Sequence, residues 1–349
     1  MQGDRQRIPV ILVTGFLGSG KTSLLNRLLR DPQFRDSAVL VNEFGEIGVD
    51  HWLIEAARDQ VVLLGAGCLC CVISDSLRET LADLYQRRSQ GVVPAFQRVL
   101  VELSGVTDPG PILQTLLKDP LIAPQFVYAG LICVLDVLHA ESQLAESVEA
   151  REQVALADRL VVSKLDVCVA GMPDSLRNEV RALNPAAPIL PIPQLTHSVV
   201  PLFESLDVRL PLSTSEHAQH ASGISTVSFQ FQPVVSWAGV AAWSGHLIER
   251  YGARMLRCKA LLRLEGRSGR VVVQGVRKVF EIHHDAALDP GDSTSVIVLI
   301  GRQLVRQELE AGLAWLQAPK DMPPMPTADF APWLESAQAA SRISRAHFS

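Results

Sequence analysis

The stretch GFLGSGKT, residues 15 to 22, decides the fold of this chain. It fulfils the pattern G-x-x-x-x-G-K-[ST] and directly follows an apolar, β-rich run from Ile8 to Val13. In this pattern, backbone N–H groups of a glycine-rich turn and of the next helix form a positive concave site for phosphate. Lys21 adds a cation for the β- and γ-phosphates, and Thr22 offers a hydroxyl to magnesium. The stretch predicts a nucleoside triphosphate site; the alternative is an ordinary glycine turn between strand and helix.

Around this loop, short β-branched runs alternate with helical segments. Strands are expected at Ile8–Val13, Ala38–Asn42, Val61–Leu64, Arg98–Glu102, Leu131–Asp136, Arg159–Ser163 and Ile189–Ile192, and helices at Thr22–Arg30 and Ser76–Arg88. The second helix starts with a capping box of Ser76 and Glu79. The pattern predicts an α/β fold, a P-loop NTPase domain with a mostly parallel sheet and helices on both faces. Ligands of such sheets bind at the carboxyl ends of the strands, where motifs should converge.

The length of 349 residues suits two domains. A polar segment without periodicity at 211–223 is interpreted as a linker. Residues 1–210 are then the nucleotide-binding domain, 224–317 a smaller α+β domain with a largely antiparallel sheet, and 318–349 a loosely held tail. In the second domain we expect strands at Ser225–Phe231, Met255–Leu264, Arg270–Ile282 and Thr294–Ile300, and helices at Trp237–Tyr251 and Gln303–Leu316.

Bulk properties exclude several classes of partner. The net charge of -5 and the pI near 6.0 give no general attraction to nucleic acid or to anionic lipid. The N-terminus lacks the apolar core of a signal peptide, and no segment approaches the roughly 20 apolar residues of a membrane span. We therefore expect a cytoplasmic protein with reduced thiols, whose six cysteines serve as ligands or packing residues.

Three of these cysteines, Cys68, Cys70 and Cys71, fall within the segment GCLCC directly after the strand Val61–Leu64. A helix start expected after Ser74 should lower the pKa of the thiols. Clustered thiolates in a reducing compartment indicate a metal such as zinc, cobalt or copper(I), with a further ligand from elsewhere. A buried cysteine-rich turn and a redox site are the alternatives. The other three, Cys133, Cys168 and Cys258, lie in apolar or strand segments and are interpreted as buried packing residues.

Three more segments follow predicted strands. In Asn42-Glu43-Phe44-Gly45-Glu46, the two glutamates can serve magnesium, orient water or join the cysteines on a second metal; for Glu46 a solvated acidic loop is the alternative. In Glu102-Leu103-Ser104-Gly105, the carboxylate can contact magnesium through water and the Gly105 N–H can meet the γ-phosphate. In Ser163-Lys164-Leu165-Asp166, the aspartate can accept N1–H and N2–H of guanine while the lysine stem covers the base.

In this order, GFLGSGKT, NEFGE, GCLCC, ELSG and SKLD resemble the CobW family of metallochaperone GTPases, SIMIBI-class proteins similar to HypB and UreG. The resemblance extends over residues 8–317 and includes Arg257–Ala260 and Gln274–Val276. It implies a GTPase that binds a transition metal at the cysteines, couples that affinity to nucleotide state and delivers the metal to a client protein. Zinc is the commonest metal of the family, and cobalt serves some members. Ser163 and Leu103 depart from the asparagine and threonine usual in the family.

The predicted site comprises nucleotide-binding residues, metal ligands and catalytic residues. The nucleotide-binding residues are Gly15, Gly18, Ser19, Gly20, Lys21, Thr22, Ser23, Glu43, Gly105, Lys164 and Asp166; the metal ligands are Cys68, Cys70, Cys71, Glu43 and Thr22. Lys21 and Glu102 are expected to take part in catalysis with GTP, Mg²⁺ and Zn²⁺ or Co²⁺. The expected partner is a metal-dependent client protein, with no nucleic acid and no membrane; the oligomeric state is left open. Competing hypotheses are an ATP-dependent kinase or ligase with structural cysteines and a GTP-bound metal sensor that does not hydrolyse.

Overall fold

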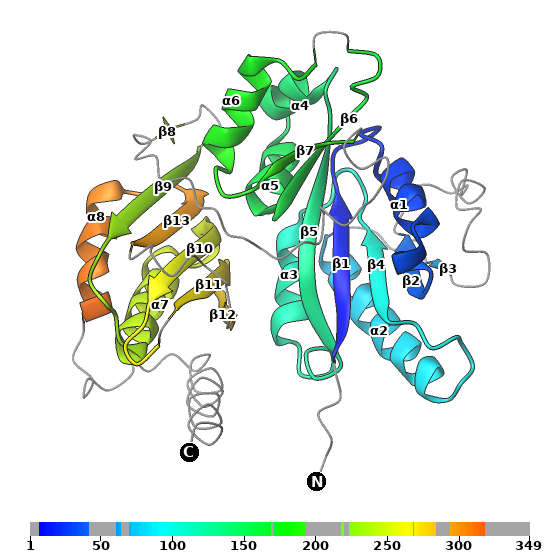
Figure 1. Ribbon diagram of the computed structural model, residues 1–349, viewed down its shortest axis with the longest axis horizontal. Helices are drawn as coiled ribbons and strands as arrows, with labels where there is room; N and C mark the ends of the chain where they lie inside the picture. The colour runs from blue at the N-terminus through cyan, green and yellow to red at the C-terminus, as the bar shows by residue number, and fades with distance from the viewer. Residues whose placement is uncertain are drawn as a thin grey trace. The chain divides into compact units, whose positions relative to one another are not determined.

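The computed structural model divides the chain into two compact units, Met1–Glu204 and Ser205–Ser349 (Figure 1). It describes residues 7–41, 61–63, 70–168, 171–192, 218–219, 223–267, 269–283 and 294–317. Of the predicted site, Glu43 and Cys68 lie outside these residues.

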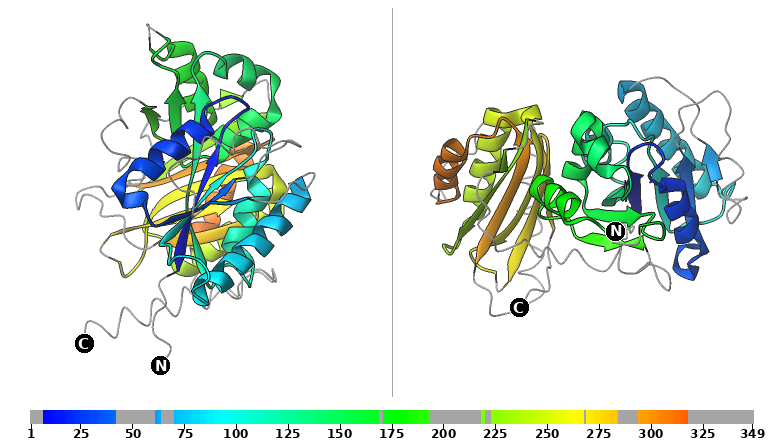
Figure 2. Two further views of the ribbon diagram at one scale, coloured as in Figure 1. Left: turned by 90° about the vertical axis from the view of Figure 1, so that its right-hand side faces the viewer. Right: turned by 90° about the horizontal axis from the view of Figure 1, so that it is seen from above.

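The first unit is built on a parallel sheet of seven strands in the order β3-β2-β4-β1-β5-β6-β7. The strands are β1 (Ile8–Thr14), β2 (Ser37–Val41), β3 (Val61–Leu63), β4 (Arg98–Glu102), β5 (Phe126–Asp136), β6 (Arg159–Ser163) and β7 (Ile189–Pro191). The helices are α1 (Lys21–Arg30), α2 (Cys70–Ser89), α3 (Pro109–Lys118), α4 (Ala140–Glu146), α5 (Val148–Leu156) and α6 (Asp174–Leu183), with a short 3₁₀ turn at Pro32–Phe34. Helices cover both faces of the sheet (Figures 1 and 2), which confirms the predicted α/β fold.

Helix α1 shows why this part of the chain folds as it does. It starts directly after the phosphate loop and buries Leu24, Leu25, Leu28 and Leu29. Leucines at this spacing form one apolar face, which packs on residues of β1, β2, β4, β5 and β6 in a single core cluster. Burying four leucines contributes roughly 6–12 kcal/mol to folding before the conformational entropy is subtracted. The loop between β1 and α1 is therefore held at both ends by the core.

Helix α2 starts earlier than the sequence predicted. It begins at Cys70, so Ser76 and Glu79 lie within the helix and the predicted capping box is wrong. A serine followed three residues later by a glutamate also occurs in the interior of helices, where it does not mark the start of the helix. The earlier start places Cys70 and Cys71 in the first turn of α2.

The second unit is an antiparallel sheet of six strands in the order β12-β11-β10-β13-β9-β8. The strands are β8 (Ala218–Gln219), β9 (Ile224–Phe231), β10 (Met255–Arg263), β11 (Arg270–Val276), β12 (Val279–His283) and β13 (Ser295–Arg302); the helices are α7 (Trp237–Tyr251) and α8 (Arg306–Gly312), with 3₁₀ turns at Gly252–Arg254 and Leu313–Gln317. Alternate strand residues pack with α7 around the fully buried Trp243. This unit is the predicted α+β arrangement.

Three details of the second unit differ from the prediction. The run Arg270–Ile282 is a hairpin of β11 and β12, because the chain reverses at Arg277. Arg277 has a φ of 52°, and the turn holds no glycine or proline from which it could have been predicted. The closing helix begins at Arg306 rather than Gln303 and tightens into a 3₁₀ turn from Leu313. Strand β8 falls within the segment predicted as a linker and pairs with β9.

The two C-terminal segments of the family resemblance lie side by side. In the β10–β11 ladder, Lys259 is opposite Gln274, and the Arg257 guanidinium donates to Gln274 Oε1 at 2.7 Å. Gly275 lies on the other face, where a Cβ would stand 2.8 Å from the Phe280 ring. These residues therefore stabilise the sheet. Within the described part of the chain, no helix is long and apolar enough to cross a membrane.

Candidate functional site

The phosphate loop lies between β1 and α1 and is shaped by glycines in the left-handed region. Gly15 has a φ of 140°, and a Cβ there would stand 2.3 Å from the Val134 carbonyl oxygen of the neighbouring strand β5. Gly20, with a φ of 95°, caps the N-terminus of α1, and Gly18 also has a positive φ. The first backbone N–H groups of a helix have no intrahelical partner, so the loop and the start of α1 offer donors to an anion.

Two side chains of α1 are held by groups at the same edge of the sheet. Lys21 is buried, and its Nζ donates to the carbonyl oxygens of Gly15 at 2.9 Å and Phe16 at 3.2 Å. Thr22 Oγ1 donates to Glu102 Oε1 at 2.9 Å. Glu102 is the last residue of β4 and pairs in register with Val13 of β1. Parallel pairing thus brings a hydroxyl and a carboxylate together across 80 residues of sequence. Ser23 is exposed on α1.

The loop after β4 packs directly on the phosphate loop. A Cβ on Gly105 would stand 2.6 Å from the backbone nitrogen of Leu17. The loop is fixed from behind by Gln153 of α5, a fully buried amide whose Nε2 donates to the carbonyl oxygens of Gly105 at 3.0 Å and Thr107 at 3.1 Å. Sequence reasoning missed Gln153, because nothing in its local pattern distinguishes it from an ordinary polar residue of a helix.

Several buried hydroxyls around this loop stand out in the described part of the chain. Among the described residues, no group forms a hydrogen bond with the side-chain oxygens of Thr14, Ser19 and Ser104. All three are at most 5% exposed, and they belong to β1, the phosphate loop and the loop after β4. Buried polar groups are normally paired, and such groups next to a helix N-terminus suit a polar ligand or ordered water.

The base-recognition segment is tied to the phosphate loop by Ser163. Its Oγ lies 2.6 Å from the Ser19 carbonyl oxygen and 3.1 Å from that of Leu135, and its hydrogen is shared between them. A serine in place of the usual asparagine therefore still links β6 to the loop. Lys164 follows with a φ of 57°, and Asp166 is exposed in the next turn.

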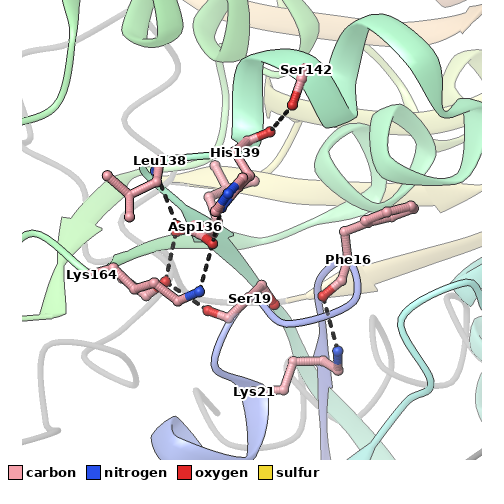
Figure 3. A network of polar contacts seen from close by, with 10 residues as sticks. Phe16, Ser19, Lys21, Asp136, Leu138, His139, Ser142 and Lys164 are labelled. Carbon is pink, nitrogen blue, oxygen red and sulfur yellow. Dashed lines mark hydrogen bonds and ion pairs between the residues drawn. The ribbon is translucent and has the colours of Figure 1, made fainter.

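Lys164 leads to a residue that sequence reasoning did not single out. Its Nζ donates to Oδ2 of Asp136, the last residue of β5, at 2.7 Å (Figure 3). The same oxygen is 2.8 Å from His139 Nδ1, and Oδ1 accepts the Leu138 N–H at 3.0 Å. Burial raises the pKa of the Asp136 carboxyl, but the hydrogen bonds from Lys164, His139 and Leu138 outweigh it and hold the pKa below its usual value. The sequence signal that could have singled out Asp136 is its position, because it is an acidic residue at the end of a predicted strand.

The predicted metal ligands are described only in part. Cys70 and Cys71 begin α2, and α2 follows β3, whose parallel neighbour is β2. In the described residues no three histidine, cysteine or carboxylate side chains form a cluster that could hold a metal. Thr22, predicted as a ligand of magnesium, donates to Glu102 Oε1.

The remaining cysteines behave as packing residues, with one exception. Burial raises the pKa of Cys133 to about 12 against a smaller opposing effect of Lys21, and burial likewise raises the pKa of Cys258. Both thiols are fully buried and uncharged. Cys168 differs from the prediction because it lies half-buried in the turn after β6, where its S–H donates to the Gly171 carbonyl oxygen at 3.0 Å.

A phosphate loop at the carboxyl edge of a parallel sheet, with Thr22 and Glu102 paired beside it, defines the first unit as a P-loop NTPase domain. Residues 9–191 match the model of the CobW/HypB/UreG nucleotide-binding domain, and residues 224–316 match the C-terminal domain of the cobalamin synthesis protein CobW. The chain belongs to the CobW/HypB/UreG family, which confirms the resemblance.

Individual relatives agree with this assignment. The chain is 32% identical over 317 residues to the zinc chaperone YjiA of Escherichia coli K12, a match that covers 89% of this chain and 99% of the relative. It is 30% identical over 356 residues to the zinc chaperone CobW of Pseudomonas aeruginosa, covering 88% and 92%. Among solved structures, the Zn(II)-bound YjiA GTPase of Escherichia coli aligns with a TM-score of 0.67 at 27% identity, over 89% of this chain and 99% of that one.

Proposed function

We propose that this chain is a GTP-hydrolysing metallochaperone that binds zinc at its C-x-C-C motif and passes the metal to a client protein according to nucleotide state. The observation that carries the proposal is the Thr22–Glu102 hydrogen bond of 2.9 Å beside the phosphate loop. It brings together two oxygen groups that a nucleotide-bound magnesium ion requires, from segments that the sequence keeps far apart. The relatives named zinc chaperones support the choice of cargo.

The phosphate loop would bind the triphosphate through its backbone N–H groups and through Lys21. The Lys21 ammonium is already turned back onto the loop, where it donates to the carbonyl oxygens of Gly15 and Phe16. When phosphate binds, the ammonium would exchange these carbonyls for β- and γ-phosphate oxygens, which are stronger acceptors. The Gly105 N–H would contact the γ-phosphate, which GDP lacks.

Thr22 and Glu102 fit magnesium because both are hard oxygen donors. The Thr22 hydroxyl would bind the ion, and the Glu102 carboxylate would hold it directly or through water. Bound magnesium supplies positive charge that neutralises the charge developing on the β- and γ-phosphate oxygens. Glu102 also accepts the Thr22 hydrogen, which leaves the lone pairs of the hydroxyl oxygen available to the ion.

Guanine would be selected by Asp166, whose two oxygens accept N1–H and N2–H together. Adenine presents no such pair of donors. Ser163 supports this selection by holding β6 to the phosphate loop at the Ser19 carbonyl oxygen. The base and phosphate subsites are therefore joined by one hydrogen bond, and a relaxed guanine preference is not expected from the serine.

Zinc would be bound by Cys68, Cys70 and Cys71, with Glu43 as a candidate fourth ligand. Support comes from α2, which starts at Cys70, so that two of the motif's cysteines belong to its first turn; the positive end of a helix dipole favours thiolates. Further support comes from the pairing of β2 with β3, since the chain leaves both strands, after Val41 and Leu63, at the edge that carries the phosphate loop. Cobalt is accepted by the same ligand types, and availability would decide between the metals.

Coupling between metal and nucleotide follows from this shared edge. GTP with magnesium would order residues 43–50 and complete the zinc site, whereas hydrolysis would loosen it and release the metal to the client. By linkage, zinc must then tighten GTP binding by the same factor. The sequence assigns no glutamine or arginine to the role of a catalytic finger, so we expect slow intrinsic hydrolysis that a client or metal accelerates.

The test is zinc and cobalt affinity, measured by competition with a chelating dye in the presence of magnesium and GTP, GDP or no nucleotide. We expect tight binding only with GTP and its loss in the double variant Cys70→Ser, Cys71→Ser. The matched control is Cys168→Ser, a half-buried thiol outside the motif, which should bind zinc as the wild type does. Zinc affinity that does not depend on nucleotide, or survives the double substitution, would contradict the proposal.

A second assay addresses the competing functions. Release of phosphate from GTP without any added acceptor supports a GTPase. Turnover of ATP with transfer to an acceptor favours a kinase or ligase, and binding without single-turnover hydrolysis favours a metal sensor.

A further inference from the structure

The buried carboxylate of Asp136 is a polar centre with three partners among the described residues, and the proposed mechanism does not use it. Its side chain is 2% exposed, yet it binds one ammonium, one imidazole nitrogen and one backbone N–H. Figure 3 shows Asp136 between Lys164 and His139, close to Ser19 of the phosphate loop. A carboxylate is costly to bury unless it is paired, so the burial of Asp136 favours keeping these partners in contact with it.

The topology places this carboxylate between the phosphate and base subsites. Strand β5 lies between β1, which leads into the phosphate loop, and β6, which leads into Ser163 and Lys164. Asp136 pairs in register with Ser163. Asp136 therefore stands at the carboxyl edge of the sheet, next to the residue that ties the base-recognition segment to the loop.

Lys164 itself carries a constraint. Its φ of 57° lies in the left-handed region, which side-chain-bearing residues rarely adopt. Such a conformation persists where the surroundings determine it, and these sites are concentrated at ligand clamps. Here two contacts do so, the Ser163 hydroxyl on one side and the bond of 2.7 Å from Lys164 Nζ to Asp136 on the other. The lysine side chain, 39% exposed, is thus held at its tip while its stem stays accessible.

We propose that Asp136 is a positioning residue for guanine recognition, which fixes the Lys164 stem in the orientation that covers the base before nucleotide binds. The inference rests on the proposed function and extends it to a residue that touches no nucleotide. Because the stem is already ordered, guanine binding avoids the entropy of fixing a long, flexible side chain. The base is common to GTP and GDP, so Asp136 contributes equally to both affinities and does not contribute to the hydrolysis step.

The experiment compares Asp136→Asn, Lys164→Met and the double variant in the full-length protein. Titration with fluorescent GTP and GDP analogues should show about tenfold weaker binding of both by Asp136→Asn, since a charge-assisted hydrogen bond is lost. The ratio of the two affinities and the single-turnover rate at saturating GTP should stay at wild-type values. Pyrophosphate, which has no base, should compete with unchanged affinity. The double variant should bind no more weakly than Lys164→Met alone.

The matched control is Asp119→Asn, which also removes an ion-paired aspartate, the partner of Arg78. Asp119 follows α3 and precedes β5, so it lies at the opposite edge of the sheet and should leave nucleotide affinity unchanged. Urea denaturation reports whether Asp136→Asn is folded. If it is not, Lys164→Met decides, because this half-exposed side chain breaks the same contact without entering the core.

Three results would overturn the inference. The affinity losses of the two single variants could add up in the double variant, pyrophosphate binding could weaken as much as nucleotide binding in Asp136→Asn, or Lys164→Met could bind nucleotide as tightly as the wild type does. These outcomes are distinct from failure of the proposed function. If the wild type binds ATP and GTP equally, or binds neither, the proposed guanine recognition is wrong. If the wild type prefers GTP but the losses of the two single variants add up in the double variant, only the role of Asp136 is wrong.

Discussion

The contact between Gly105 and the phosphate loop yields the sharpest prediction. A Cβ at Gly105 would stand 2.6 Å from the nitrogen and 2.9 Å from the Cα of Leu17. Ordinary contacts of a Cβ begin at 3.4 Å, so Gly105→Ala must separate the two segments by about 0.8 Å. The Leu17 side chain can rotate away, but its backbone belongs to the phosphate loop and cannot. The Gln153 amide holds the other segment from behind.

The magnitude follows from this displacement. Overpacking of a tight contact costs about 1–3 kcal/mol, so the free energy of unfolding of Gly105→Ala should fall by this amount. A misplacement of about 1 Å at a reacting centre lowers rates by about 100-fold, so we expect a loss of 10- to 100-fold in single-turnover GTP hydrolysis. GTP affinity should fall more than GDP affinity, because the shifted segment carries the proposed γ-phosphate contact.

Urea denaturation and stopped-flow binding of fluorescent GTP and GDP analogues measure these quantities. Gly269→Ala is the matched control, since in the described part of the chain no atom beyond its chain neighbours lies within 4 Å of the added Cβ; its stability should change by less than about 1 kcal/mol. If Gly105→Ala hydrolyses GTP at the wild-type rate with unchanged stability, the contact between the two loops does not position the phosphate site and the reasoning fails.

Three further predictions concern single side chains. Gln153→Leu removes the donor from two buried carbonyl oxygens and should lower the free energy of unfolding by about 2–4 kcal/mol, measured in urea, and reduce the ratio of GTP to GDP affinity. Asp166→Asn should weaken GTP binding by about 100-fold and strengthen binding of xanthosine triphosphate, whose base has a carbonyl in place of the amino group. Competition between the two nucleotides measures this change. The free energy of unfolding should stay unchanged, because Asp166 is exposed. For Asp136, the folded pKa is depressed, so its contribution to stability is present above the unfolded pKa of about 3.9 and is lost as pH falls through the folded pKa. The difference in unfolding free energy between wild type and Asp136→Asn should therefore be present at about pH 5 and shrink as pH falls below about 4; a difference that does not shrink down to about pH 2 would refute it.

Local pattern was sufficient for much of this protein. A phosphate loop is defined by eight consecutive residues and a preceding apolar strand, so GFLGSGKT was enough to predict the loop and the α/β fold around it. The structure confirms the parallel sheet. Strands β4 and β6 and helix α7 occupy the predicted residues, because in each one the apolar pattern ends at a polar or turn-forming residue. Local signals failed where they were weak, as at the Arg277 turn and the first turn of α2.

The order of the motifs along the chain was also enough to predict the family, whereas the contacts within the site required the tertiary structure. Thr22 meets Glu102, Ser163 meets the Ser19 carbonyl oxygen, and Gln153 meets Gly105 across separations of 80, 144 and 48 residues. Such pairs depend on strand order and register, which no local pattern encodes. Sequence by itself determined which chemical groups this protein carries; the packing of the parallel sheet decided which of them act together, because only folding brings the ends of β1, β4, β5 and β6 to one edge.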